Sequence, residues 1–327
     1  MFNEKIAGGD VHTINIIPVF EKSIIVGSPF LKDHLKYNVK FISALLSKPI
    51  KESNKLKILY AFTLRTIYSS CMVLNKKPDL CVAATDYWFD IIPALCCRSK
   101  KILVTSQMIP RGVYHKSNFL LSLFLLRLVK HKVYFTATQS EVKDYLINKG
   151  FCSSRIKIIQ NGADEDKTEP QKKQYDIVWI GRVHLQKNIP LLLEVIKCGN
   201  FKALLIGDLK DLHDTQLSEM VTNGQVKLAG YLNSEEKYKA LKSAKAFVLT
   251  SSHEGSPICI EEAITCKVPV VVTNIPSLRS AFGDRIEYAL PTPETFVAAI
   301  LKTIQSNKCP EPQTWDKVRM QIKDLIS

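Results

Sequence analysis

The sequence predicts an α/β protein made of two Rossmann-like domains, each with a parallel sheet. Three observations support this prediction. Short apolar runs rich in β-branched residues alternate with longer helical segments, which is the pattern of βαβ units. The alternation stops at a polar stretch near the middle of the chain and then starts again. The length of 327 residues suits two ordinary domains of this class.

Composition indicates a folded protein of a reducing compartment. Hydrophobic residues make up 46% and charged residues 23% of the chain, which is typical of globular proteins. The nine cysteines form no metal-like CxxC pairs, so we expect neither a zinc site nor a disulfide framework. No basic-then-apolar leader opens the sequence, and we therefore expect a cytoplasmic location.

The net charge of +14 lies entirely in the first half of the chain. Residues 1–163 contain 24 Lys and Arg against 10 Asp and Glu, whereas residues 164–327 contain 21 of each kind. A surplus confined to one domain suggests an anionic partner for that domain. A phospholipid surface, an acidic or phosphate-linked acceptor and nucleic acid are the candidates. The sequence contains no recognised nucleic-acid-reading motif, so we expect no nucleic-acid partner.

Residues 1–163 are expected to form the first domain. Gly8-Gly9-Asp10 has the composition of a glycine turn that opens a helix and normally follows a buried strand. Residues 1–5 are too short and polar to be that strand, so we expect this domain to lack its first strand. The other expected elements are helices over 11–20, 56–74, 87–97, 119–129 and 141–149 and strands over 23–26, 39–42, 80–84, 101–105, 133–138 and 156–159.

The helix expected over 119–129 is apolar nearly all round and has basic flanks. Its eleven residues are too few to span a bilayer, which needs about 20. Such a helix is either buried in the domain or lies against a membrane surface with its basic flanks near the headgroups. The sequence leaves both alternatives open.

Residues 164–311 are expected to form the second domain, with the polar stretch 164–174 as the linker. We expect residues 312–327 to form a last helix that packs back on the first domain. The expected strands lie over 176–180, 203–206, 226–228, 246–249 and 268–272, and the expected helices over 189–198, 235–243, 291–304 and 315–326.

Residues 251–263 form a loop that turns into a helix and carries two carboxylates, Glu254 and Glu262. A buried strand precedes this stretch, so it lies at the carboxyl end of a parallel strand, where ligands of such sheets bind. The free N–H groups at the helix start suit a phosphate, and ionised carboxylates suit sugar hydroxyls. Alternatively, Glu262 is a solvated helical acid and Glu254 a favourable charge near a helix start.

Several spaced motifs of the second half resemble the large family of retaining glycosyltransferases with the GT-B fold, family 4 or glycosyl transferases group 1. The matching residues are Gly181-Arg182 with Lys187 for the GR…K element, Glu254 and Glu262 for E-x7-E, Gly255-Ser256-Pro257 for the phosphate loop, and Val268-Pro269-Val270-Val271 for G-x-PVV, with Lys267 where glycine is usual.

The resemblance implies two facing domains, with the active site in the cleft between them. The second domain would hold a nucleotide-diphosphate sugar and the first an acceptor. Arg182 and Lys187 would neutralise the diphosphate leaving group, Glu262 would contact the ribose and Glu254 the transferred sugar. The other implied donor-binding residues are Gly181, Gly255, Ser256, Pro257 and Ile258.

In the first domain, Gly8, Gly9 and Asp10 would form a glycine loop that contacts the donor phosphate or the acceptor. Gln107 stands where many relatives carry a histidine. This departure leaves the sugar identity open. It also motivates an alternative function, a catalytically impaired homologue that acts as a binding or partner subunit.

The resemblance therefore implies a metal-independent hexosyltransferase without a cofactor. It would move a hexose, with retention of configuration, from a nucleotide sugar to a hydroxyl of a glycan or lipid-linked acceptor of the cell-envelope or exopolysaccharide type. The basic first domain adds the expectation of peripheral attachment to an anionic membrane, at the inner face of the cell membrane.

Overall fold

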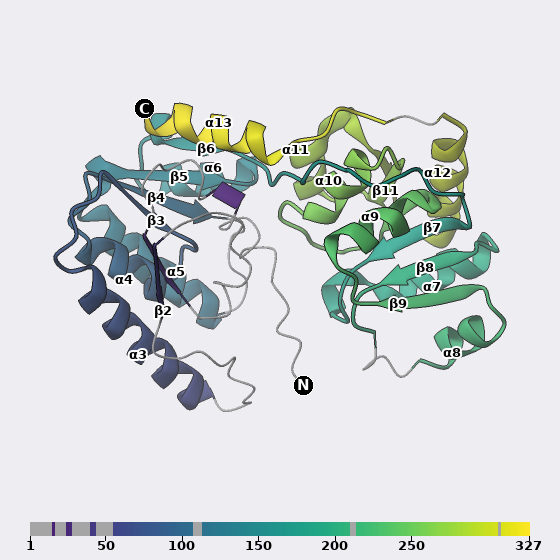
Figure 1. Cartoon of the computed structure of the whole chain (residues 1–327), viewed down its shortest axis with the longest axis horizontal. Helices are drawn as coiled ribbons and strands as arrows, with labels where there is room; N and C mark the ends of the chain where they lie inside the picture. Colours follow the sequence, from purple (N-terminus) through teal and green to yellow (C-terminus); the bar gives the residue numbers. More distant parts are fainter. Residues whose placement is uncertain are drawn as a thin grey trace. The chain divides into compact units, whose positions relative to one another are not determined.

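The computed structural model describes residues 15–16, 24–27, 40–43, 55–106, 113–209, 214–306 and 309–327. The chain divides into two compact units, one of Met1–Gln160 with Trp315–Ser327 and one of Asn161–Thr314 (Figure 1). Both units are α/β with parallel strands, which confirms the predicted fold class. The glycine turn of residues 8–10 lies outside the described residues. So do residues 1–5, where we expect the first strand to be missing.

The first unit contains a four-stranded parallel sheet of order β3-β4-β5-β6, and β1 and β2 form a separate parallel pair. Buried side chains of α4, α5 and α6 pack against β4 and β5 to form its core. The strands are β1 (Ile24–Gly27), β2 (Lys40–Ser43), β3 (Leu80–Ala83), β4 (Lys101–Ser106), β5 (Val133–Ala137) and β6 (Ile156–Ile158). The helices are α3 (Lys55–Val73), α4 (Trp88–Cys96), α5 (Val113–Arg127) and α6 (Ser140–Asn148).

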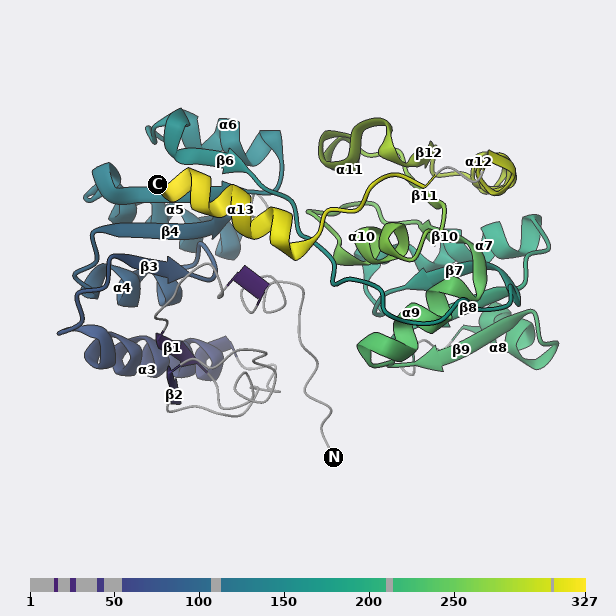
Figure 2. The ribbon, with the colours of Figure 1, turned by 45° about the horizontal axis from the view of Figure 1, so that its top comes forward.

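The last helix of the chain, α13 (Trp315–Ile326), belongs to this first unit. It lies along the sheet near β5 and β6, as Figures 1 and 2 show. Trp315, Val318 and Ile322 are its buried residues. Lys157 on β6 donates a hydrogen bond to the Gln321 carbonyl at 3.2 Å. The amphipathic spacing of these apolar residues therefore attaches the end of the chain to the unit in which it began.

The second unit is a six-stranded parallel sheet of order β12-β11-β10-β7-β8-β9. Its first strand along the chain, β7, lies in the middle with β8 on one side and β10 on the other. The order of connection reverses between β7 and β10, which makes this the topological switch point of a doubly wound sheet. The strands are β7 (Tyr175–Ile180), β8 (Ala203–Ile206), β9 (Val226–Gly230), β10 (Ala244–Leu249), β11 (Val270–Thr273) and β12 (Glu287–Ala289).

Helices cover both faces of this sheet, which explains why its strands are apolar on both sides. Ile177 and Trp179 of β7 pack into one core layer, whereas Val178 packs into the other. The first layer includes α7 (Ile189–Cys198), α8 (Thr215–Thr222) and α12 (Pro293–Ser306). The second includes α9 (Ser234–Lys242), α10 (Ile258–Thr265) and α11 (Pro276–Phe282) (Figure 2).

Three elements of the second unit were not predicted, namely α8, α11 and β12. All are short, and their boundaries depend on local signals. The Asp214 carboxylate caps α8 by accepting a hydrogen bond from the Leu217 N–H at 3.0 Å, and α11 starts at Pro276. The polar stretch 164–174, which we expected to be the linker, is attached to the second unit, since Lys242 pairs with Asp166 at 2.5 Å.

Asp86 follows β3 and precedes the next helix, a position where an aspartate often serves as the N-cap. The N-cap of α4 is Tyr87 and carries no side-chain cap bond. Asp86 is instead buried, and its Oδ2 accepts a hydrogen bond from the Ser106 hydroxyl at the end of β4 at 2.6 Å. Burial raises the pKa of Asp86 to about 7, because the Ser106 hydrogen bond offsets only part of the lost hydration.

Folding stability should depend on pH through Asp86. The unfolded carboxyl ionises near 3.8 and the folded one near 7, so its contribution is complete below the first value and is lost as pH rises through the second. We expect the free energy of unfolding to fall by about 2–4 kcal/mol more between pH 4 and pH 8 in the wild type than in Asp86→Asn. Urea denaturation at each pH measures the free energy of unfolding, and Asp144→Asn, at an exposed aspartate, is the control. Parallel pH profiles for the wild type and Asp86→Asn would contradict the prediction.

Candidate functional site

The predicted site residues of the second unit follow β7 and β10, the two strands at the topological switch point. Gly181, Arg182 and Lys187 lie in the loop after β7, which contains a short 3-10 turn at Leu185–Lys187. Glu254 lies in the loop between β10 and α10. Because β7 and β10 are parallel neighbours, both loops leave the same edge of the sheet.

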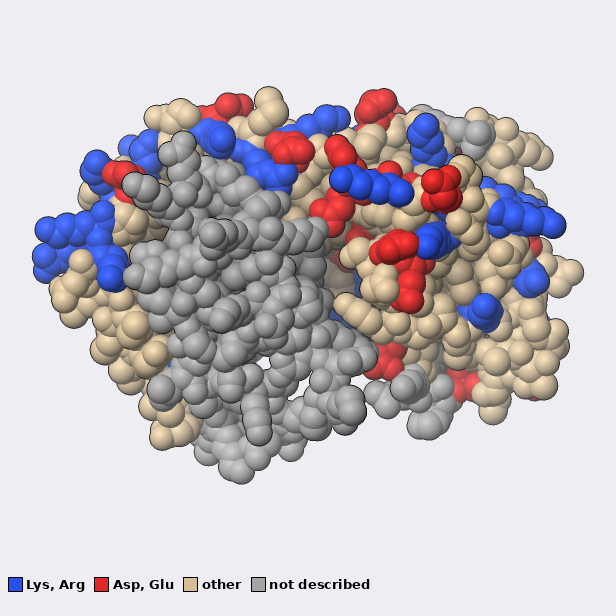
Figure 3. Space-filling model, viewed as in Figure 1, with Lys and Arg blue, Asp and Glu red and all other residues tan. Residues whose placement is uncertain are grey.

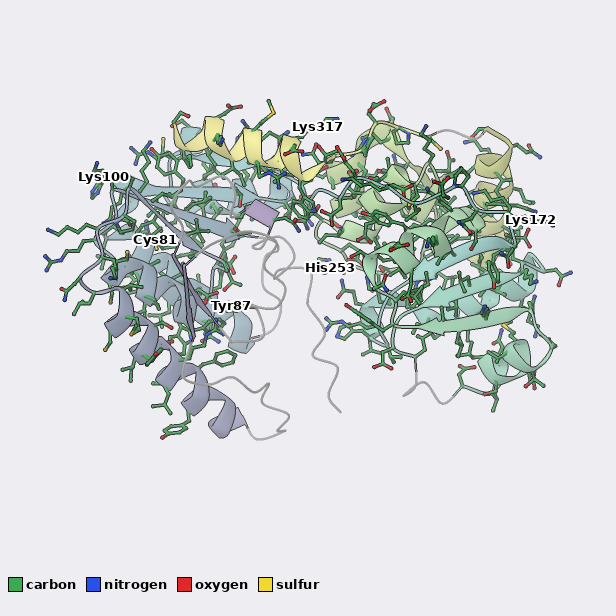
Figure 4. The ribbon with its side chains drawn as sticks, viewed as in Figure 1. Cys81, Tyr87, Lys100, Lys172, His253 and Lys317 are labelled. Carbon is green, nitrogen blue, oxygen red and sulfur yellow. The ribbon has the colours of Figure 1, made fainter. Side chains whose placement is uncertain are left out.

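Hydrogen bonds hold these two loops together. The Thr250 hydroxyl donates to the Lys187 carbonyl at 2.9 Å, and the Ser252 N–H donates to the Gln186 carbonyl at 2.8 Å. The Gln186 side chain donates to the carbonyl of His253, which Figure 4 labels in the loop after β10. The backbone around Lys187 is therefore fixed before any ligand arrives.

Glycine is required where β7 and β8 end side by side. A Cβ on Gly207, whose φ is +129°, would lie 1.7 Å from the Gly181 carbonyl oxygen. A Cβ on Gly181 would lie 2.4 Å from the Trp179 ring. The close approach of the two strand ends therefore requires glycine at position 207, and the Trp179 ring leaves no room for a side chain at Gly181 of the GR element.

Lys187 and Glu254 form a largely buried ion pair. The Lys187 Nζ lies 2.7 Å from Glu254 Oε1, and their side chains are 15% and 7% exposed. Two charges held out of water at this separation stabilise each other, while either alone would carry a large desolvation cost. The structure therefore brings these two predicted residues into direct contact.

Glu262 forms a second ion pair, with a residue that the sequence did not single out. Lys237 on α9 places its Nζ 2.5 Å from Glu262 Oε1. Burial lowers the pKa of Lys237, but the charge and hydrogen bond of Glu262 outweigh it, so that the pKa is raised above its ordinary value. Lys237 stands in the run Glu235-Glu236-Lys237, which looks like a solvated helix face, and no sequence signal marked it.

Asn161 holds the loop before α10. Its N–H donates to the Ser256 hydroxyl at 2.9 Å, and its side-chain amide donates to the Ser256 carbonyl at 2.6 Å. Pro257 is the N-cap of α10 and makes no side-chain cap bond. The loop of Gly255, Ser256, Pro257 and Ile258 is thereby fixed at a helix N-terminus, where the free N–H groups favour an anion.

The other predicted site residues make none of these contacts or lie outside the described part of the chain. Arg182 is exposed and makes no hydrogen bond or ion pair with any residue in the described part of the chain. Gly8, Gly9, Asp10 and Gln107 lie outside the described residues. Among the residues described, no three His, Cys, Asp or Glu side chains gather into a group that could hold a metal ion.

Glu261, next to Glu262, has a structural role. It is fully buried, and its carboxylate pairs with the Arg285 guanidinium through two hydrogen bonds of 2.7 and 3.0 Å. It also accepts the Gln313 N–H at 2.9 Å, and Arg285 donates to the Glu311 carbonyl at 2.7 Å. Glu261 thus anchors the last segment of the second unit, whereas its neighbour points to the Lys237 ammonium.

The domain type of this half follows from comparison with known families. Residues 161–317 match the family described as Glycosyl transferases group 1. Residues of this chain are 28% identical over 161 positions to the O-antigen chain mannosyltransferase B of Escherichia coli, which covers 44% of this chain and 42% of that protein. The putative teichuronic acid biosynthesis glycosyltransferase TuaC of Bacillus subtilis is 31% identical over 168 positions, or 47% of this chain and 40% of that protein. The matched part spans less than half of these relatives.

Solved structures extend the likeness to the fold of nearly the whole chain. HepE of Anabaena, whose structure contains UDP and glucose, superposes with a TM-score of 0.69 at 16% identity, covering 99% of this chain and 97% of that one. At this identity the likeness concerns the fold alone. The two parallel α/β units match those of GT-B glycosyltransferase neighbours.

Removing the Glu261 carboxylate should strongly destabilise the second unit. We expect Glu261→Ala to lower the free energy of unfolding by about 3–5 kcal/mol, because it leaves the Arg285 charge partly buried without its partner. Urea denaturation measures this change. Glu235→Ala removes an exposed glutamate paired with Lys239 one turn away and should leave stability unchanged within error. Equal effects of the two substitutions would refute the assigned anchoring role.

Proposed function

We propose that this protein transfers a hexose from a nucleotide-diphosphate sugar to a hydroxyl of a glycan or lipid-linked acceptor, with retention of configuration. The observation that carries the proposal is the Lys187–Glu254 pair at the switch point, in a domain of the glycosyl transferases group 1 type. The names of the similar proteins, an O-antigen mannosyltransferase and a teichuronic acid biosynthesis glycosyltransferase, favour a cell-envelope polysaccharide as the product.

The diphosphate would bind to cations and backbone donors that the chain itself supplies. A lysine ammonium has three N–H donors, so Lys187 can keep its bond to Glu254 and still donate to a phosphate oxygen. Arg182 adds a planar fork, and the N-terminus of α10 adds its free N–H groups. These contacts strengthen as charge develops on the leaving group, which is the kind of binding that raises kcat.

The two glutamates divide the rest of the donor. Glu254 would accept hydrogen bonds from hydroxyls of the transferred sugar, and Glu262 from the ribose. Gly181, Gly255, Ser256, Pro257 and Ile258 would surround the phosphates with backbone. The first unit would take the acceptor, and Gly8, Gly9, Asp10 and Gln107 would contact either the donor phosphate or the acceptor.

Retention follows when the acceptor attacks from the side of the leaving group. The bond from the acceptor oxygen to the anomeric carbon forms as the bond from that carbon to the phosphate oxygen breaks. The proton of the acceptor hydroxyl passes to the departing phosphate oxygen. This route requires no protein base, no metal ion and no cofactor.

Loss of the Lys187 charge should impair transfer far more than it impairs folding. We expect Lys187→Met to lower kcat/KM by about 10²–10³-fold, because the developing phosphate charge loses a preorganised cation. Nucleotide release from a panel of nucleotide sugars, with a glycan acceptor present, measures the change.

Lys242→Met is the matched control for this variant. Lys242 pairs with Asp166 at 2.5 Å, and these side chains are 14% and 10% exposed, much as in the Lys187 pair. Both variants should lose stability, whereas only Lys187→Met should lose turnover. Equal turnover in the two variants would exclude the proposed role. A wild type that binds nucleotide sugars and turns none of them over would favour the impaired binding subunit.

We also infer that the first unit contacts an anionic membrane surface through α5. Phe119, Leu123 and Leu126 are buried in the core, whereas Leu121 and Phe124 on the same helix are exposed. One face of this helix is thus buried in the core, and the exposed apolar side chains of the other face support the proposed membrane contact. Figure 3 shows Lys and Arg side chains gathered at the left edge of this unit. None of the helices in the described ranges is long and apolar enough to cross a bilayer.

Liposome binding should depend on Leu121 of α5 and on Leu128, which directly follows this helix, because both are exposed. We expect Leu121→Ser with Leu128→Ser to lower partition onto anionic phosphatidylglycerol vesicles at low salt about tenfold, because less apolar surface enters the headgroup region. Leu290→Ser with Leu301→Ser in the second unit is the matched control, because the two pairs are similarly exposed. Leu121 and Leu128 are 48% and 69% exposed, and Leu290 and Leu301 are 56% and 49% exposed. Co-sedimentation measures partition, and equal binding of both double variants would overturn the inference.

A further inference from the structure

The Lys237–Glu262 ion pair includes a residue to which the proposed reaction assigns no role. That residue is Lys237. Glu262 points from α10 toward α9, and the ammonium of Lys237 meets its Oε1 at 2.5 Å. The two side chains are 22% and 11% exposed, so both are largely withdrawn from water. Glu262 Oε2 makes no other hydrogen bond with the described part of the chain and remains able to accept one.

We propose that Lys237 is a positioning residue that fixes the Glu262 carboxylate and thereby sets how strictly the site requires the hydroxyls of the nucleotide's ribose. The proposal rests on the proposed function, in which Glu262 binds the ribose. It adds that Lys237 holds Glu262 in place and that this raises the preference for ribose over deoxyribose.

The position of the ammonium is itself well fixed. Lys237 lies in the first turns of α9, whose start is held by a capping box of Asn233 and Glu236. Its neighbour Tyr238 is buried and donates a hydrogen bond to the Asp164 carbonyl at 2.9 Å. Since α9 packs on α10 in the same core layer, the backbone that carries Lys237 is fixed relative to the helix that carries Glu262.

Fixing one carboxylate oxygen has a direct effect on recognition. With Oε1 held by Lys237, the carboxylate presents Oε2 in one orientation, and a ribose hydroxyl can donate to it. A deoxyribose lacks that hydroxyl and would leave a largely buried, charged oxygen unpaired, which costs binding energy. Without Lys237, Glu262 can turn to water or to other donors, so the same deoxyribose would be rejected less.

A purely structural ion pair makes a different prediction. Removing such a pair would lower stability and leave the ratio of ribonucleotide to deoxyribonucleotide affinity unchanged. Lys242 provides this comparison on the same helix, because its buried pair with Asp166 lies outside the proposed site.

Isothermal titration with UDP, GDP and ADP and their 2′-deoxy and 3′-deoxy counterparts tests the proposal on the full chain. We expect the wild type to prefer the ribonucleotide over at least one deoxy form by about tenfold or more. In Lys237→Met, ribonucleotide affinity should fall about tenfold and the preference to about twofold, with KM raised and kcat little changed. Lys237→Arg should restore most of the preference, and Lys242→Met should keep all of it.

Glu262→Gln and the double variant complete the design. If Lys237 acts through Glu262, adding Lys237→Met to Glu262→Gln should not reduce the ribose preference further. Should Lys237→Met fail to fold, Lys237→Ala also removes the donor for Oε1 and is measured in the same way.

The outcomes separate the two levels of the argument. A wild type that binds no nucleotide would reject the proposed function itself. A wild type that prefers ribonucleotides, with the same preference in Lys237→Met or Lys237→Ala, would overturn the role of Lys237 and leave the proposed function standing.

Discussion

The structure of the second unit depends on ion pairs that allow three glutamates to be buried. Glu254, Glu261 and Glu262 stand within nine residues of one another, and all three are buried. Each carboxylate lies against a different cation, namely Lys187, Arg285 and Lys237. A buried carboxylate without a partner would cost more than most single interactions stabilise. The three pairs therefore determine how the loop after β10 and the helix α10 can lie on the sheet.

The sheet in turn explains why these cations are available. Because β7 is central, the loop that carries Lys187 leaves the sheet beside the loop that carries Glu254, although 67 residues separate them. Lys237 arrives from the helix that precedes β10, and Arg285 from the segment that precedes β12. Lys187, Lys237 and Glu254 follow the strands β7, β9 and β10, and a doubly wound sheet brings the carboxyl ends of its strands to one edge. Arg285 precedes β12 and is not placed by that edge.

Most of the architecture could be predicted from the sequence, because it depends on local patterns. Central strands such as β7 and β10 are continuous apolar runs, and only a parallel sheet covered on both faces buries such runs. The apolar run before Glu254 also predicted that this residue follows a buried strand, as it does after β10. The left-handed backbone of Lys267, with φ +54°, explains why glycine is usual at that position of the motif.

The parts that were missed depend on contacts across the fold. Glu261 and Glu262 are identical in type, and only the direction of α10 decides which one faces Arg285 and which faces Lys237. Lys237 belongs to a charged run that is usually solvated, and it is only partly exposed because α9 packs on α10. The elements α8 and β12 are too short for periodicity to identify, and Asp214 caps α8 through a contact that composition alone does not reveal.

The ion pairs also resolve an apparent conflict in the proposed donor site. A nucleotide diphosphate is anionic, and two buried glutamates beside it would repel it. Lys187 and Lys237 neutralise Glu254 and Glu262 one for one, so the glutamates add no net charge, while Glu262 Oε2 can still accept a hydroxyl. The exposed guanidinium of Arg182 and the N-terminus of α10 then remain as net positive contributions. A site arranged in this way can hold sugar hydroxyls on carboxylates and still attract the phosphates that carry them, which neither set of residues could do alone.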